Sequence, residues 1–251
     1  MPEGLTNTPA GFQRFMYDIL ANMIDVSVVV YLDDILVYSD DPKQHSAHVW
    51  EVLTWLRCNW LYAQAKKCKF HCNSCEYLGY MLSPDSLTMA QNKIQAIQDQ
   101  DWPEPRKVWD IMSFLRFANF YHCFIYGYLE ITVPPTRLTQ KDVPWDFSDN
   151  CRKSFEKVKK AFTTAPVLTH WIPNTPIMVE TDTSDYALVA VLSIHTLDGN
   201  YHPVAFHSQM FKGAETNYDI HDKELMAIYD AFKRWLKGTG TPIDINIIFQ
   251  Q

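Results

Sequence analysis

The stretch VVVYLDDILVYSDD, residues 28–41, places two adjacent carboxylates between two apolar, β-branched runs. Residues 28–31 and 35–38 are typical strand formers, so the sequence predicts a β-hairpin with Asp33 and Asp34 at its tip. Two carboxylates about 4 Å apart repel each other by about 4 kcal/mol at an effective dielectric constant of about 20, unless a cation or water compensates. A solvated turn would meet this need. Because the strands are apolar on both faces, however, we expect a hairpin built into a core, with its tip facing a cleft.

Helical and strand-like patterns alternate around this hairpin. Apolar residues at helical spacing predict one helix within residues 5–24, beginning after Thr8-Pro9, and a second helix over residues 45–56. Strand-like segments follow up to about Leu82. This order of helix, hairpin, helix and hairpin predicts an α+β fold with an antiparallel sheet.

Three cysteines and one histidine lie close together before the second predicted hairpin, at Cys68, His71, Cys72 and Cys75. Zinc signatures normally contain two well-spaced pairs of ligands, whereas C-x3-C-x2-C has no second pair. The surrounding segment KCKFHCNSCEYLGYML has the pattern of a β-hairpin. We therefore expect free thiols on strands here.

Composition limits the classes of partner. The 251 residues include 22 Lys and Arg against 29 Asp and Glu, which gives a formal net charge of −7. A nucleic-acid role would therefore depend on local basic patches or on metal ions. The six cysteines come without a secretory leader, and no apolar run reaches the roughly 18 residues of a membrane-spanning helix. We expect an intracellular, reduced protein, cytoplasmic or nuclear, with no membrane partner.

The second half begins with a helical, aromatic-rich segment over residues 90–139, which Pro103 and Pro105 interrupt. A connector follows, and Ser148 is a candidate N-cap for the next helix. The apolar face of that helix would consist of Phe155, Val158 and Phe162.

The C-terminal third predicts a sheet and one long helix. We expect strands over PIMVETDTSD, ALVAVLSIHT and YHPVAFHSQM, a helix over DKELMAIYDAFKRWLKG, and a last apolar segment, IDINIIF. Glu224 would lie beside the inward face of the helix. That face would consist of Leu225, Ile228, Phe232, Trp235 and Leu236.

Nine sequence blocks in a fixed order resemble a known family. They are MPEGLTNTPAGFQRFM, YLDD, CEYLGYMLSPDSLTM, DWPEPRKVWDIMSFL, ANFYHCFI, WDFSDNCRKSFEKVKKAF, VETDTSDYA, HPVAFHS and NYDIHDKELMAI. YLDD alone would be weak evidence, but nine blocks in one order leave little room for coincidence. Over nearly its full length, the chain resembles the reverse transcriptase and ribonuclease H polyprotein of gypsy-type long-terminal-repeat retrotransposons.

The resemblance implies a fold class and a domain order. An α+β reverse transcriptase palm, in part, would occupy residues 1–85, and a helical thumb residues 86–140. A connection would follow over residues 141–170. Residues 171–251 would form a ribonuclease H-like α/β domain that is truncated at its C-terminal end.

The resemblance also implies a polymerase site at the hairpin. In this family the Y-x-D-D hairpin lies in the palm, and its first Asp shares two Mg²⁺ ions with an Asp on an upstream strand. Asp33 would be that catalytic metal ligand, and Asp34 its catalytic and metal-binding neighbour. Tyr31 and Leu32 would shape the floor under the primer terminus. The reaction would be nucleotidyl transfer, for which paired carboxylates supply the hard oxygen ligands that Mg²⁺ prefers.

Two further sites follow from the resemblance. Tyr77, Leu78 and Gly79 in CEYLGY match the hairpin that holds the primer strand. Asp182 in VETDTSD and Glu224 in DKELMAI match catalytic, metal-binding acids of ribonuclease H, which places two Mg²⁺ ions around an RNA phosphate. Taken alone, Glu224 would be a solvated helix residue and Asp182 part of a turn. The presence of both blocks at family spacing favours the functional interpretation.

The chain departs from the family pattern at both ends. It starts at the MPEGLTN block, downstream of the family's other polymerase Asp, and ends before the T-D-H that supplies a third ribonuclease H acid. Glu3 replaces an aromatic residue near the nucleotide site, and Arg116 replaces a thumb glycine. With one metal ligand fewer in each site, we predict that the isolated fragment has little or no activity.

Two alternatives remain open. The chain could bind an RNA/DNA template–primer duplex without chemistry, and two clusters of lysines support this interpretation weakly. A complementing polymerase segment, upstream or on a partner polypeptide, could instead supply the fingers and the second Asp and so restore the use of nucleotides. The lysine clusters are Lys66, Lys67 and Lys69, and Lys153, Lys157, Lys159 and Lys160.

Overall fold

The computed structural model describes residues 6–98, 102–235 and 245–249, the last of these by their backbone alone. The chain divides into two compact units, Met1–Leu78 and Gly79–Gln251. Within the described ranges, no helix has both the length and the apolar character needed to cross a lipid bilayer.

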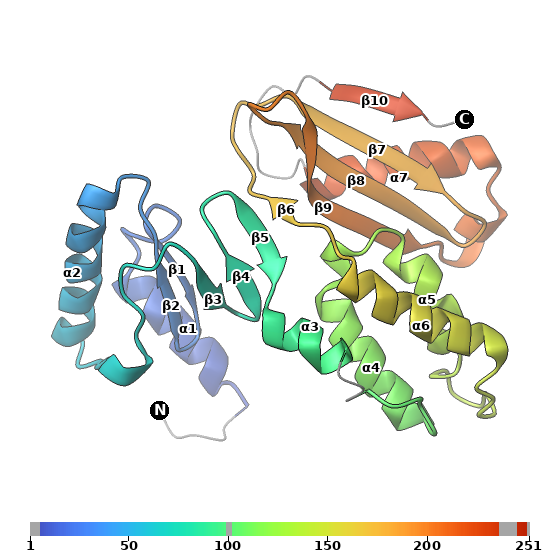
Figure 1. Cartoon of the computed structure of the whole chain (residues 1–251), viewed down its shortest axis with the longest axis horizontal. Coiled ribbons are helices and arrows are strands. Elements are labelled where there is room, and N and C mark those ends of the chain that lie inside the picture. The colour runs from blue at the N-terminus through green and yellow to red at the C-terminus, as the bar shows by residue number, and fades with distance from the viewer. Residues whose placement is uncertain (1–5, 99–101, 236–244, 250–251) are drawn as a thin grey trace. The chain divides into compact units, whose positions relative to one another are not determined.

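The first unit contains two helices and a two-stranded antiparallel sheet (Figure 1). Asp41 caps the second helix, because its Oδ1 accepts a hydrogen bond of 2.9 Å from the Lys43 amide, and Pro42 follows at a position where proline is tolerated. The elements are α1 (Thr8–Ile19), β1 (Val28–Tyr31), β2 (Asp34–Val37), α2 (Pro42–Cys58), the 3₁₀ turn η1 (Ala65–Lys67) and β3 (Cys75–Tyr77).

Only one face of the predicted Asp-Asp hairpin is covered. Val28 and Val30 are buried against both helices, whereas Val29 and Tyr31 on the other face are 37% and 55% exposed. The expectation of a hairpin buried on both faces is therefore wrong for the described residues. The reason is that α1 and α2 contribute to a single core on the same side of the sheet. That core is Met16, Leu20, Met23, Val28, Val30, Val52 and Leu56.

The cysteine-rich segment contains less strand than its pattern predicted. Residues 68–74 form no strand, and only Cys75 lies in one. The described cysteines are free thiols, as expected.

The second unit combines a helical layer with two sheets (Figure 1). One sheet has the antiparallel strands β4, β5 and β6; the other has the order β10-β7-β8-β9, with β10 parallel to β7 and the remaining pairs antiparallel. The elements are β4 (Tyr80–Leu82), β5 (Ser86–Met89), α3 (Gln91–Gln98), α4 (Val108–Phe120), η2 (His122–Phe124), α5 (Tyr128–Arg137), α6 (Asp149–Thr163), β6 (Leu168–Thr169), β7 (Ile177–Thr183), β8 (Ala187–His195), β9 (Tyr201–Met210), η3 (Gly213–Asn217), α7 (Ile220–Trp235) and β10 (Ile245–Phe249).

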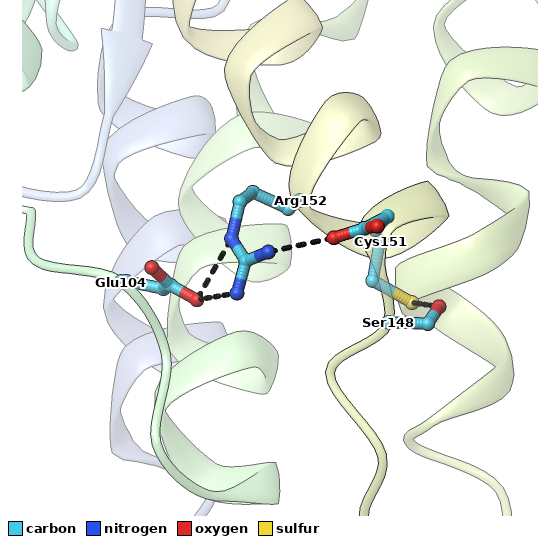
Figure 2. Close-up of polar contacts among 5 residues, drawn as sticks. Glu104, Ser148, Cys151 and Arg152 are labelled. Atoms are coloured by element: carbon cyan, nitrogen blue, oxygen red, sulfur yellow. Dashed lines mark hydrogen bonds and ion pairs between the residues drawn. The ribbon is translucent and has the colours of Figure 1, made fainter.

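The helix α6 has the predicted buried face of Phe155, Val158 and Phe162. Ser148 precedes it as expected, but its hydroxyl does not cap the helix. Instead it donates to the Cys151 sulfur at 3.6 Å (Figure 2).

An exposed ion-pair network ties the start of α6 to the loop before α4. The Arg152 guanidinium donates to Glu104 at 2.8 Å and to Asp149 at 2.8 Å (Figure 2). Both acids raise the pKa of Arg152, Glu104 most strongly. Because these side chains are about half exposed or more, we expect the network to contribute little to stability.

The helix α7 lies across one face of the larger sheet (Figure 1), but with a different inward face from the predicted one. Ala227 and Ala231 are fully buried against the sheet, whereas Leu225 is 65% exposed. Leu225 is two residues, or about 200°, away from Ala227 around the helix, so its predicted place in the core is wrong. Phe232 and Trp235 do pack against this core. Leu236, like Glu3, lies outside the described residues.

Candidate functional site

The two acids of YLDD lie at the tip of the hairpin, as the sequence predicted. Leu32 and Asp33 form the turn, and Tyr31 faces Asp34 across the strands. Asp33 and Asp34 are both exposed. Leu32 has a φ of 51°, a conformation that is uncommon for a residue with a side chain and that persists only where its surroundings enforce it.

Gln13 supplies that enforcement, a role that the sequence motifs did not predict. Its Nε2 donates to the Val30 carbonyl at 3.0 Å, and its Oε1 accepts from the Leu32 amide at 2.6 Å. One side-chain amide from α1 therefore satisfies backbone groups on both sides of Tyr31. A signal was present in the sequence. Gln13 is polar but lies three residues before Met16 and seven before Leu20, which places it on the same face of the helix as these buried residues.

We predict that replacing Gln13 loosens the acidic tip. In Gln13→Ala the Leu32 amide loses its acceptor, and we expect a destabilisation of about 1 kcal/mol together with faster hydrogen exchange at Leu32. Exchange mass spectrometry of the peptide covering residues 28–37 measures this change. Gln44→Ala, at an exposed position of α2, is the matched control. Unchanged exchange in Gln13→Ala would show that the contact does not hold the turn.

Tyr77, from the predicted primer-holding block, lies beside the same hairpin. Its hydroxyl is 3.5 Å from the Val29 carbonyl and 3.4 Å from the Asp34 carbonyl, which are long hydrogen bonds. Burial, and then the negative charge of Asp34, raise the pKa of Tyr77. The structure thus brings Tyr31, Leu32, the two acids and Tyr77 together within the first unit.

Leu78 and Gly79 form a turn in which both residues have positive φ, of 51° and 81°. The Gly79 carbonyl accepts a hydrogen bond of 3.1 Å from the Tyr121 hydroxyl at the end of α4. A Cβ atom on Gly79 would lie only 2.9 Å from that hydroxyl oxygen. Backbone conformation and space therefore both favour glycine at this position.

Tyr80, the next residue, packs into an aromatic group. Its ring stacks on Phe120 with 5.3 Å between centroids, and its hydroxyl donates to the Phe120 carbonyl at 3.2 Å. Burial raises the pKa of Tyr80 to about 12. These contacts fix the chain leaving the Leu78–Gly79 turn against α4.

Asp182 is the penultimate residue of β7 and is exposed. Its Oδ1 accepts from the Thr183 amide at 2.8 Å. Asp182 shares a sheet face with Glu180, because alternate residues of a strand point the same way. Tyr126 lies near this face: burial, and then Asp182, Glu130 and Glu180, raise its pKa.

Glu224 comes from α7, on the other face of that sheet. It is half-buried and lies one turn before Ala227, which packs with Leu188. Leu188 pairs with Thr183, so Glu224 and Asp182 lie toward the same end of the sheet. Side-chain alternation nevertheless points Asp182 away from the face that α7 covers. In the part of the chain that the structure describes, no three His, Cys, Asp or Glu side chains are grouped so that they could hold a metal ion.

Two known families match the two ends of the chain. Residues 1–82 match the family described as reverse transcriptase (RNA-dependent DNA polymerase), and residues 147–241 match the RNase H-like domain found in reverse transcriptase. The chain therefore contains one region similar to reverse transcriptases and a second region similar to the RNase H-like domain that reverse transcriptases carry.

Its curated relatives are retrotransposon polyproteins. The Tf2-3 and Tf2-7 transposon polyproteins of Schizosaccharomyces pombe are each 34% identical over 248 residues, which is 98% of this chain and 18% of each polyprotein. The chain therefore spans about a fifth of the length of the relatives it matches. These findings confirm the relationship to retrotransposon reverse transcriptase polyproteins that the nine blocks indicated.

Solved structures support the fold. The foamy viral protease-reverse transcriptase dRH in complex with double-stranded DNA matches with a TM-score of 0.83 and 21% identity, over 100% of this chain and 44% of that one. The foamy viral protease-reverse transcriptase in complex with an RNA/DNA hybrid matches with a TM-score of 0.80, also at 21% identity, over 100% of this chain and 34% of that one. The predicted α+β class, with reverse transcriptase and ribonuclease H-like parts, is confirmed.

The acids are of the chemical type that binds a divalent metal ion, but too few of the described acids lie together to hold one. Reverse transcriptase and RNase H-like families generally use divalent metal ions. Carboxylate oxygens suit Mg²⁺, yet Asp33 and Asp34 are neighbours on one turn, and Asp182 points away from the face that carries Glu224. We therefore derive no catalytic step through a metal ion from these residues.

Proposed function

We propose that the chain is the template–primer-binding part of a retrotransposon RNA-directed DNA polymerase. Its palm would span residues 1–85, its thumb 86–140, its connection 141–170 and its ribonuclease H-like domain 171–251. The observation that carries the proposal is the exposed acidic tip, which Gln13 holds in a strained turn and which Tyr77 flanks. The strain lies in the backbone of Leu32, whose positive φ persists only where its surroundings enforce it, and such strained positions are typical of functional sites.

We assign Mg²⁺ as the ion for these acids. Asp33 and Asp34 would contribute ligands at the hairpin, but only together with a further carboxylate. Asp182 and Glu224 lie toward the same end of their sheet on different faces, so each would contribute a ligand in the ribonuclease H-like domain only together with other groups. Bound there, the ion would lower the pKa of a primer hydroxyl and offset the negative charge of a phosphate.

The other residues of the polymerase part would position the acids and contact the primer strand. Gln13 fixes the turn that carries the acids, and Tyr31, Leu32 and Tyr77 surround it. Leu78 and Gly79 form the turn that leads into β4. We propose Tyr31, Leu32, Tyr77, Leu78 and Gly79 as the residues that contact the primer.

We propose further that the 251-residue chain alone binds template–primer but does not extend it. A two-ion site needs carboxylates from separate elements, and the hairpin offers only neighbouring ones. A complementing polypeptide that contributes another carboxylate would restore the use of nucleotides. The chain alone would therefore bind template–primer without extending it, and the chain together with the complementing polypeptide would extend it.

Primer extension tests this proposal. With an RNA template, a DNA primer, nucleotides and Mg²⁺, we expect duplex binding by the chain but extension at background level, and extension above background once a polypeptide carrying the upstream palm and fingers is added. Asp33→Ala should lower the restored extension about 100-fold or more. Asp85 is an exposed acid in the β4–β5 turn, and Asp85→Asn should leave the extension unchanged. Robust extension by the chain alone that Asp33→Ala abolishes would overturn the proposed inactivity. Failure to bind template–primer would overturn the function itself.

A further inference from the structure

The segment after α2 combines exposed aromatic side chains with unpaired cations. Trp60 is 81% exposed, Tyr62 76% and Phe70 51%. Arg57, Lys66, Lys67 and Lys69 are exposed around them, and none of these four cations forms an ion pair with any residue that the structure describes. We call residues 57–70 the aromatic–basic segment.

This segment is a local exception to the charge of the chain. Residues 52–75 contain no Asp or Glu, whereas the whole chain has seven more acidic than basic residues. A run of four cations without intervening acids creates a local positive potential, which attracts phosphate groups. The three lysines by themselves give only weak support for duplex binding, because exposed lysines are usually solvated.

Trp60 holds a backbone conformation that tryptophan does not favour. The Leu61 amide donates to the Leu56 carbonyl at 2.9 Å, and the Trp60 amide donates to the Arg57 carbonyl at 3.1 Å. This pair of bonds is the Schellman motif that ends many helices, and its C′ residue, here Trp60, has a φ of 60°. Glycine or asparagine normally occupies that place, because a side chain is strained there.

The local fold does not explain why tryptophan occupies this place. Leu61 packs against the core of the first unit, and the residues on either side of it, Trp60 and Tyr62, turn outward into solvent. Both rings therefore flank one buried anchor on the outside of the unit. A strained position that presents a large ring to solvent is typical of a binding site.

We propose that the aromatic–basic segment is a docking site for single-stranded nucleic acid. Bases would stack on Trp60 and Tyr62, and the phosphates would contact Arg57 and the three lysines. A single strand fits better than a duplex, because the faces of duplex bases are already stacked on one another. This inference rests on the proposed template–primer function and adds a surface for the unpaired part of a template, formed by residues other than those of the acidic hairpin.

The test uses the full chain and fluorescence anisotropy with labelled dT15 and with a blunt 15-base-pair duplex. In Trp60→Gly/Tyr62→Ala we expect dT15 binding to weaken at least tenfold, while binding of the blunt duplex changes less than twofold. Replacing Lys66, Lys67 and Lys69 with Gln should flatten the slope of log K against log salt for dT15 by about 2. Tyr229→Ala/Lys233→Gln removes an exposed ring and an exposed cation from α7 and should change neither measurement.

The substitution Trp60→Gly distinguishes an effect on folding from an effect on binding. Because glycine relieves the positive φ, Trp60→Gly should unfold at the same or a higher temperature than the parent chain. Unchanged dT15 binding in the double variant would overturn the single-strand site. So would competition by heparin, a polyanion without bases, that is as strong as competition by unlabelled dT15. A chain that binds the duplex but not dT15 overturns this inference alone, whereas a chain that binds neither overturns the proposed function as well.

Discussion

Gly79→Ala should destabilise the second unit by about 3 kcal/mol, one of the largest effects expected from adding a single methyl group to this protein. A positive φ of 81° contributes one part of this cost, because side chains are strained in that conformation. The other part is steric, since the new Cβ would lie 2.9 Å from the Tyr121 hydroxyl oxygen. Tyr121 cannot easily move away, because the residue is buried, with 2% of its surface exposed.

A comparison with Gly199 separates the backbone cost from the steric cost. Its φ is 83°, almost the same as that of Gly79, but a Cβ atom there would meet nothing within 4 Å. Gly199→Ala should therefore show the backbone cost alone, about 1 kcal/mol. Urea unfolding followed by circular dichroism gives both values, and equal losses in the two variants would show that Tyr121 does not restrict Gly79.

A double-mutant cycle tests the contact directly. Tyr121→Phe removes the hydroxyl that donates to the Gly79 carbonyl and should cost about 1 kcal/mol by itself. In the double variant the steric conflict is gone, so the total loss should be smaller than the sum of the two single losses by about 1 kcal/mol or more. Simple additivity would contradict the close packing of Gly79 against Tyr121.

The strands of the ribonuclease H-like sheet were predictable from local sequence. Residues 187–195 and 201–210 form β8 and β9 at nearly the predicted bounds, because long runs of apolar and β-branched residues end at turn-forming residues. The position of Asp33 at a hairpin tip was predictable for the same reason. Local pattern was enough wherever the structure depends on neighbours in sequence.

The features that local pattern did not reveal depend on distant contacts. Gln13 holds the Leu32 turn across 19 positions in sequence, and no spacing rule links the two residues. The periodicity of α7 marked Leu225 as buried, but the sheet selects the face with Ala227 and Ala231, where small side chains allow close approach. Likewise, the family resemblance predicts Asp182 and Glu224 in one site, but the direction of the Asp182 side chain depends on the register of β7, which sequence spacing does not reveal.

A buried His–Asp pair joins α7 to the sheet that carries Asp182. His207 on β9 and Asp230 on α7 lie 2.8 Å apart between Nε2 and Oδ2, and their side chains are 8% and 15% exposed. Burial lowers the pKa of His207, while its hydrogen bond to Asp230 acts in the opposite direction. The imidazole is therefore held mainly neutral in the folded chain and donates to a carboxylate.

Asp230→Ala should destabilise the second unit by about 2 kcal/mol at pH 7.5, because the buried imidazole loses a charged hydrogen-bond acceptor. His202→Ala is the matched control: His202 contacts Asp198 at the same distance, 2.8 Å, but is 42% exposed, and its loss should be small. Urea midpoints for the parent chain and both variants measure the difference. Equal midpoint shifts in the two variants would show that burial does not strengthen the His207 contact.

The lowered pKa of His207 also fixes the sign of a pH effect. Its folded-state pKa lies below the unfolded value of about 6.5, so between the two values the unfolded chain binds more protons. The contribution of His207 to stability is therefore complete above about pH 6.5 and is lost as the pH falls through the folded-state pKa. In Asp230→Ala the hydrogen bond that raises this pKa is absent, so the folded-state pKa of His207 should be lower still. The loss of stability on acidification should then extend to lower pH and be larger in total. Urea midpoints between pH 7.5 and 5 should fall further in Asp230→Ala than in His202→Ala, and parallel curves would mean that His207 does not titrate with folding.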